Sequence, residues 1–204
     1  MKKFLTFLCA VMPVLGMIGS AGAVSFQNGS FETGDFTGWD VITSAGGSVS
    51  VVTGNSGFGP TDGTYFANLV ANSKISQDQI WSAGETISFD WNFNANDYLP
   101  FNDYSIFSII STNGSMLFNY TLANVAATGN FNATGWNTYQ YTFATAGSGS
   151  IGFGVYNFGD TIYDSQLYID NVGGTAPVPE PATILLMGSG LLGLVGYSCK
   201  RKKS

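Results

Sequence analysis

Residues 86–94 read TISFDWNFN, and apolar and polar side chains alternate through the whole stretch. The apolar positions are Ile87, Phe89, Trp91 and Phe93. Successive side chains of an extended strand point to opposite faces, so the apolar residues share one face and the polar residues share the other. The stretch therefore predicts a β-strand with one face in a hydrophobic core.

Eight further short segments, rich in β-branched and aromatic residues, also read as strands. They are residues 48–53, 64–71, 74–80, 104–111, 116–122, 138–144, 150–156 and 166–172. Turns rich in Gly and Asn separate them, and residues 112–115 and 146–149 are predicted hairpins. Nine short strands without helical periodicity predict an all-β domain, a single jelly-roll β-sandwich. An immunoglobulin-like sandwich is the alternative.

The predicted sandwich is strongly acidic. Residues 24–177 contain one base, Lys74, and twelve of the chain's 13 Asp and Glu residues, a net charge of −11. Such a domain repels nucleic acid, which needs a basic footprint. The chain has no histidine, so Ser-His-Asp catalysis and histidine-based zinc sites are excluded. Both cysteines, Cys9 and Cys199, lie near the chain ends, so the domain has no disulfide.

The N-terminus reads as a secretory signal peptide over residues 1–23. Lys2 and Lys3 precede an apolar run over residues 4–18, and Ala21-Gly22-Ala23 is a small-residue cleavage site. We expect the mature chain to begin near Val24.

The C-terminus has three parts in fixed order. A linker over residues 175–181 ends in Pro179-Glu180-Pro181, an apolar run covers 182–199, and residues 200–204 are basic. A helix of that apolar run would be roughly 27 Å long, close to the ~30 Å hydrocarbon core. It is predicted to span the membrane with the basic tail in the cytoplasm. The alternative is a buried C-terminal helix. The sandwich domain then covers residues 24–174.

This tail resembles the PEP-CTERM sorting signal of exported bacterial proteins over residues 178–204. The resemblance implies that a membrane-embedded exosortase cuts near Pro179-Glu180-Pro181. The protein would then be held in the inner membrane before processing and reach the cell surface or the extracellular space afterwards. The same tail is sometimes labelled an ice-binding protein C-terminal domain, which does not itself imply ice binding.

Residues 28–39 read NGSFETGDFTGW and residues 167–172 read LYIDNV. These two end motifs resemble galactose-binding-like jelly rolls, which include carbohydrate-binding modules. In that family the opening Glu and the closing Asp commonly share a calcium ion, which implies Glu32 and Asp170 here, with Asp62 as a further ligand. Calcium accepts six to eight oxygen ligands. The alternative is that these carboxylates bind backbone N–H groups.

Aromatic residues in predicted loops or at strand ends are candidate ligand contacts. They are Trp81, Tyr98, Phe101 and Trp136. The loop around Tyr98 and Phe101 is rich in Asn and Asp, the chemistry that hydrogen-bonds sugars. Alternatively, the loop caps strands through side-chain-to-backbone bonds, or Asp97 and Asp103 bind a surface calcium without EF-hand spacing. Phe31 and Trp39 are predicted core residues.

The sequence favours an exported, non-catalytic protein of the cell surface or extracellular matrix that binds glycan, with exopolysaccharide as its expected partner. One alternative is a structural or adhesive matrix protein without a specific ligand. Another is a glycoside-active enzyme that uses two carboxylates. The expected partners are an exosortase-type membrane protease, the membrane itself and extracellular polysaccharide.

Overall fold

The computed structural model describes residues 23–44 and 46–176, which form ten strands and one short helix. The first five strands are β1 (Asp40–Thr43), β2 (Ser48–Val52), β3 (Phe66–Val70), β4 (Ser73–Trp81) and β5 (Thr86–Asn94). Then come β6 (Tyr104–Ser111), β7 (Met116–Asn124), α1 (Val125–Thr128), β8 (Asn137–Thr142), β9 (Gly147–Tyr156) and β10 (Gln166–Thr175). The predicted signal peptide and membrane-spanning helix lie outside the described residues, apart from Ala23.

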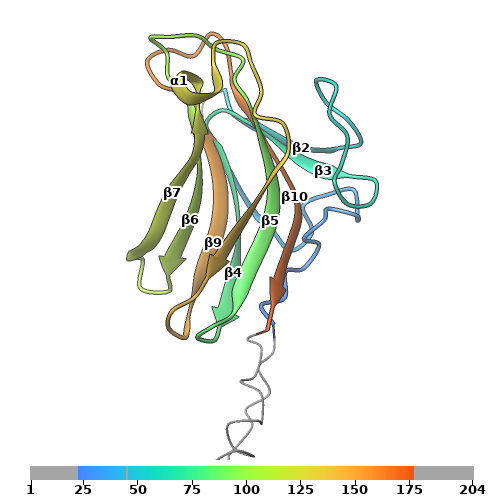
Figure 1. Ribbon diagram of the computed structural model, residues 1–204, viewed down its shortest axis with the longest axis vertical. Coiled ribbons are helices and arrows are strands. Elements are labelled where there is room, and N and C mark those ends of the chain that lie inside the picture. The colour runs from blue at the N-terminus through green and yellow to red at the C-terminus, as the bar shows by residue number, and fades with distance from the viewer. Residues whose placement is uncertain (1–22, 45, 177–204) are drawn as a thin grey trace, which may run out of the picture.

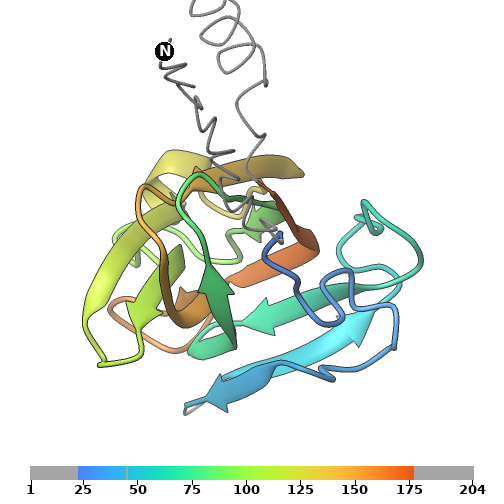
Figure 2. The same cartoon turned by 90° about the horizontal axis from the view of Figure 1, so that it is seen from below.

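The strands form two five-stranded sheets in which all neighbouring strands are antiparallel. The first sheet has the order β1-β4-β9-β6-β7, and the second has the order β2-β3-β10-β5-β8. The sheets pack face to face as the two layers of a sandwich (Figure 1 and Figure 2). The predicted all-β sandwich is therefore confirmed.

Aromatic rings from both sheets fill the space between the layers. The ring of Phe89 lies 4.6 Å from that of Phe153 and 5.0 Å from that of Phe107. Each ring is fully buried, and burial of such a side chain contributes about 1.5–3 kcal/mol. Trp39 packs on Phe31 at 5.5 Å and extends this core, so the predicted core role of both residues is confirmed.

Part of the outer face of the second sheet is also covered, which the alternation in residues 86–94 did not predict. Asp90 and Asn92 point away from the main core, yet both are buried. A second, smaller aromatic cluster accompanies them: Phe58, Phe66, Trp136 and Tyr168. The segments around Phe58 and Trp136 therefore fold over this face, so it is not the solvent face of a simple sandwich.

All nine predicted strands are present, with shifted ends, but one predicted hairpin is wrong. Residues 112–115 join β6 to β7, which pair as predicted. Residues 146–149 do not join a hairpin, because β8 pairs with β5 while β9 lies between β4 and β6. Gly149 serves close packing instead of a turn, since a Cβ there would overlap the carbonyl oxygen of Ile110.

Candidate functional site

The opening and closing motifs lie side by side, as their family resemblance implied. The N–H of Val172 donates to the carbonyl oxygen of Gly29 at 3.0 Å. A Cβ at Gly29 would overlap the carbonyl oxygen of Val172, so the approach requires glycine. The register of β10 on β5 shifts between Asp170 and Gly173, where Asn171 has a φ of 51°. Asn tolerates this conformation better than most residues.

The three predicted calcium ligands gather around one turn, residues 61–65. Asp170 is fully buried, and its Oδ2 accepts from the N–H groups of Thr61 and Asp62 at 2.7 and 3.0 Å and from the Thr61 hydroxyl. Glu32 Oε1 accepts from the N–H groups of Thr64 and Tyr65. The two carboxylates thus bind adjacent halves of the same turn.

This geometry gives the carboxylates partners without a cation, as the backbone-binding alternative expected. The Asp62 side chain accepts from the Ser30 hydroxyl at 2.7 Å, and Asp170 Oδ1 accepts from the Asn171 N–H at 2.7 Å. In residues 23–44 and 46–176, no three Asp, Glu, His or Cys side chains form a group that could hold a metal ion. A calcium ion at Glu32, Asp62 and Asp170 stays a prediction.

Burial controls the ionisation of Asp170. Desolvation raises the pKa of its carboxyl above the ordinary value of 3.8, against the opposing effect of its hydrogen bonds from Asp62, Thr61 and Asn171. A buried carboxylate is costly unless donors satisfy it. The turn at residues 61–65 supplies those donors, so the turn and the charge depend on each other.

Two of the four predicted ligand aromatics are not exposed platforms. Trp81 is only 4% exposed and stacks on Phe143 at 4.6 Å, so the expectation that it is exposed is wrong. Trp136 is half-buried: its ring packs edge-on against Phe66 and its indole N–H donates to the Gly59 carbonyl. An aromatic residue at a strand end or in a loop often closes an adjacent core, and both do so here.

Tyr98 and Phe101 do come together, and two further aromatics join them. Phe101, Phe131 and Tyr163 lie with ring centroids 5.5, 5.6 and 6.3 Å from that of Tyr98. We call these four residues the apical aromatic cluster. Phe131 is 59% exposed and Tyr163 49%, so the cluster presents apolar ring surface to solvent.

The apical aromatic cluster lies on three loops at one end of the sandwich. These apical loops, residues 95–103, 129–136 and 157–165, gather near α1, whereas β10 ends at the opposite end of the sandwich (Figure 1). Backbone and side-chain bonds join them: the Phe131 N–H donates to the Asp97 carbonyl at 3.0 Å, and the Leu99 N–H donates to Asn130 Oδ1 at 3.1 Å. The rings are therefore held on connected loops.

Sequence reasoning missed Phe131 and Tyr163. Phe131 stands between Asn130 and Asn132, and Tyr163 precedes Asp164, so both have the Asn and Asp neighbours that singled out the loop at Tyr98. That shared composition was the available signal. Their proximity was not readable, because the three loops are far apart in sequence and only the sheet order brings them together.

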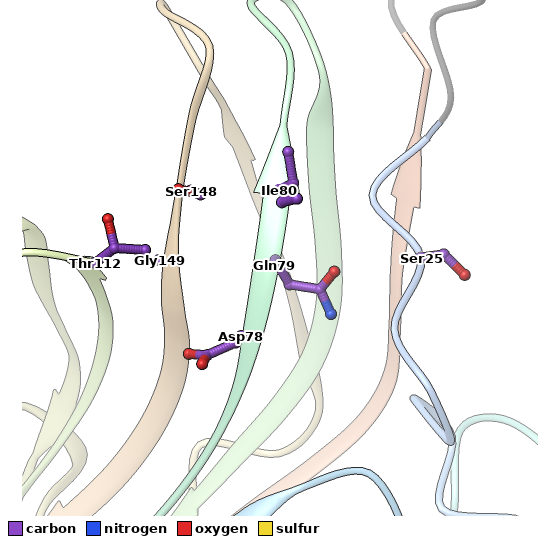
Figure 3. A pocket seen from close by; sticks show the side chains of 7 residues that line it. All are labelled: Ser25, Asp78, Gln79, Ile80, Thr112, Ser148 and Gly149. Atoms are coloured by element: carbon purple, nitrogen blue, oxygen red, sulfur yellow. The ribbon is translucent and has the colours of Figure 1, made fainter.

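A cleft of about 570 Å³ opens elsewhere, beside β4 and β9 (Figure 3). Its lining residues are Ser25, Asp78, Gln79, Ile80, Thr112, Ser148 and Gly149. Asp78 and Gln79 point to opposite sides of β4 (Figure 3). The lining has no aromatic side chain, so the cleft lacks the stacking surface of the apical aromatic cluster.

Comparison with known proteins supports the predicted sorting signal and the predicted fold. Residues 177–202 match the PEP-CTERM protein-sorting motif, which identifies the chain as an exported protein. These residues lie outside the described part of the chain. No curated protein matches the chain. Within residues 23–44 and 46–176, no helix has the length and apolar character needed to cross a membrane.

Several solved structures have a similar fold. The carbohydrate-binding module TmCBM61, solved with β-1,4-galactotriose, is 20% identical with a TM-score of 0.51, over 74% of this chain and 98% of that one. An arabinose-bound α-L-arabinofuranosidase, MgGH51, is 12% identical with a TM-score of 0.50, over 78% of this chain and 28% of that one. The CBM22-1 xylan-binding domain of Xyn10C from Paenibacillus barcinonensis is 12% identical with a TM-score of 0.41, over 78% and 96%. The described domain thus shares its β-sandwich fold with the carbohydrate-binding module TmCBM61.

Proposed function

We propose that the chain is an exported, non-catalytic glycan-binding protein of the cell surface or extracellular matrix, and that the apical aromatic cluster carries its ligand. The observation that supports this proposal most directly is the convergence of four aromatic rings on connected loops, with Tyr98, Phe131 and Tyr163 exposed and Phe101 half-buried. Monomeric proteins rarely gather exposed apolar surface without an interaction to serve. Loops on a rigid scaffold commonly hold binding residues.

The surroundings of these rings suit a sugar. A pyranose presents apolar C–H faces, which stack on aromatic rings, and hydroxyl groups, which need hydrogen-bond partners. Asn130 and Asn132 flank Phe131, and Asn96 and Asn102 lie in the loop of Tyr98. The apical loops therefore combine ring faces with amide groups.

The negative charge of the domain limits the class of glycan that it can bind. With one base and twelve acids in residues 24–177, the domain repels polyanions over about 8–10 Å at ordinary ionic strength. We therefore propose a neutral polysaccharide as ligand and exclude uronate-rich polymers. The sorting motif supplies export, and cleavage by an exosortase at Pro179-Glu180-Pro181 is part of the same proposal.

The test is retention of the full-length chain, purified in mild detergent, on a panel of neutral and acidic polysaccharides. We expect retention on a neutral polymer, and Tyr98→Ala and Tyr163→Ala each to weaken it by about 1–2 kcal/mol, roughly 5–30-fold. Tyr120→Ala is the matched control, because Tyr120 is an exposed tyrosine on β7, outside the apical loops.

Three results would each change the proposal. Retention on no polymer would leave a structural or adhesive matrix role. Equal loss in the Tyr120→Ala variant would remove the apical aromatic cluster as the site. Release of sugar by the wild-type chain, abolished by one carboxylate substitution, would make the protein an enzyme.

A further inference from the structure

Beneath the apical aromatic cluster lies a carboxylate whose charge has no compensation. Asp97 is fully buried, and its Oδ1 accepts from the N–H of Tyr98 at 2.7 Å. Its Oδ2 is buried and has no hydrogen-bond partner. An ionised oxygen in that position is costly unless a donor or a cation satisfies it.

The charges nearest to Asp97 have the same sign. Burial, and then the carboxylates of Asp103, Asp160 and Asp164, raise the pKa of Asp97 above its ordinary value. No basic side chain in the described ranges contacts it: Lys74, the one base there, lies on β4 beside Gly152. The apical loops thus concentrate four acids without a protein cation.

Two more buried oxygen atoms in the same loops lack partners, namely Asn157 Oδ1 and Ser165 Oγ. Both residues are joined to the acids around Asp97. The amide nitrogen of Asn157 donates to Asp164 Oδ1 at 2.7 Å, and the N–H of Ser165 donates to Asp103 Oδ2 at 3.2 Å. Buried polar atoms in native proteins almost always have partners, and all three open atoms here are oxygens.

We propose that the apical loops bind one calcium ion, with Asp97 Oδ2 as the charged ligand and Asn157 Oδ1, Ser165 Oγ and water completing the shell. Both oxygens of Asp103 already accept from N–H groups, at Phe158 and Ser165, so the set is mixed and contains no three-carboxylate group. Calcium accepts amide, hydroxyl and water oxygens in flexible geometry, whereas magnesium demands a near-ideal octahedron.

The proposed ion would act on the apical aromatic cluster through the chain itself. Tyr98 follows Asp97 directly, and Tyr163 directly precedes Asp164. Phe131 is tied by its N–H to the Asp97 carbonyl. An ion that links Asp97 to Asn157 and Ser165 would therefore fix two of the three loops, and it would hold the third through Phe131.

Thermal melting of the full-length chain, with calcium and with chelator, tests the site. We expect calcium at 100 times its dissociation constant to raise the melting temperature by about 5–10 °C. In chelator, Asp97→Asn is expected to melt above the wild type, because the substitution removes a buried, uncompensated charge. In calcium the wild type should melt above Asp97→Asn. The variant should bind calcium at least about 10–100-fold more weakly, since even the loss of a residue that only supports a metal ligand typically has this effect.

Two further variants locate the effect. Asp78→Asn makes the same charge change at an exposed position of β4, and it should keep the full calcium response. Asp170→Asn tests whether calcium binds instead beside the turn at residues 61–65, and this variant too should keep the full calcium response. A calcium response that survives Asp97→Asn, or that disappears in Asp170→Asn alone, would overturn the proposal.

Terbium luminescence provides a second measurement that does not depend on the folding of a variant. Excitation of tyrosine should sensitise terbium bound beside Tyr98 and Tyr163, and calcium should quench this emission by competition. The wild type without sensitised emission and without a melting shift would refute the site. Both measurements are made without glycan, so failure of glycan retention would leave this result standing.

Discussion

At the scale of single residues, Asp170 links two segments that are remote in sequence. It lies on β10, and its side chain accepts from the backbone of residues 61–62 and from Asn171. Because these N–H groups face a buried carboxylate, its removal leaves several donors unpaired. Burial raises the pKa of Asp170, and the hydrogen bonds from these donors oppose that rise.

We expect Asp170→Ala to destabilise the domain by about 2–4 kcal/mol, since unpaired buried donors cost 1–3 kcal/mol each and partial rearrangement recovers some of this. Urea unfolding of the full-length chain measures it. Asp78→Ala is the control, because Asp78 is exposed. A loss no larger than that of the control would show that the turn at residues 61–65 does not depend on this carboxylate.

The pKa of Asp97 predicts a pH dependence with a definite sign. Because its pKa is raised above 3.8 in the folded protein, the native state holds the proton at a pH where the unfolded state has lost it. In chelator the wild type should therefore gain stability as pH falls through the folded pKa of Asp97. The advantage of Asp97→Asn should be full above the folded pKa of Asp97 and should vanish towards about pH 4, where the unfolded chain also takes up the proton.

The difference in unfolding free energy between the two proteins, measured across that range in chelator, isolates Asp97 from the other acids. Asp35 acts in the opposite direction, because hydrogen bonds from Thr33 and Thr37 lower its pKa. Asp35 contributes equally to the unfolding free energy of both proteins, so its contribution cancels in the difference. A difference that does not change with pH would mean that Asp97 has the same pKa in the folded and unfolded states.

At the scale of elements, β9 shows how closely the first sheet packs. It lies between β4 and β6, where Gly149 pairs with Gln79 and Ser111. A Cβ at Gly149 would overlap the Ile110 carbonyl and lie 2.8 Å from the Ser111 Cα. Both neighbours are backbone atoms of a central strand, so they cannot move aside as a flexible side chain would.

Gly149→Ala is expected to destabilise the chain by about 1–3 kcal/mol through overpacking. Gly173→Ala, on β10, should be neutral or slightly stabilising, because nothing lies within 4 Å of its Cβ position and alanine restricts the unfolded chain. Denaturant unfolding of both variants compares them directly. Equal effects would argue against backbone contact as the cause.

Nine of the ten strands were predictable, because short segments rich in β-branched and aromatic residues, several of them alternating, mark strands. β1 was missed because all four of its side chains are exposed, so its pairing with β4 leaves no burial pattern in the sequence. α1 is one turn long and lies against β7, too short for any period. The glycines at residues 147–149 resembled a turn because sequence does not distinguish a turn glycine from a closely packed one.

The candidate site was predictable only in part, because its composition can be read from the sequence but the strand order that brings its loops together cannot. Tyr98 and Phe101 share one loop, whose composition marked them, whereas Phe131 and Tyr163 reach it through strand order. Trp81 looked exposed because it ends a strand, but it faces Phe143 across the core. Which side of a strand end faces solvent depends on the partner sheet, and a single sequence does not specify that.

At the scale of the whole molecule, the apical aromatic cluster and the end of β10 lie at opposite ends of the sandwich (Figure 1). The sorting motif at residues 177–202 follows β10 directly in the chain. A ligand bound at the apical loops would therefore lie far from the point where β10 ends.

We expect Pro179→Ala together with Pro181→Ala to block processing and leave a longer chain in the membrane fraction. Glycan retention by the extracted variant should be unchanged, because the apical loops are untouched. Fractionation of the native host, with immunodetection of chain size, measures the first result. The same size and location as the wild type would exclude processing at this motif.

Lys74 pairs with Ile42 on one side and Gly154 on the other, inside the first sheet. It is also the one lysine or arginine in residues 24–176. Proteases that cut after basic residues need an extended, accessible segment, so the folded domain offers them nothing until β4 separates from its neighbours. Within residues 24–176, trypsin-like enzymes therefore have one site, and the rate of cleavage there measures how often the sheet opens.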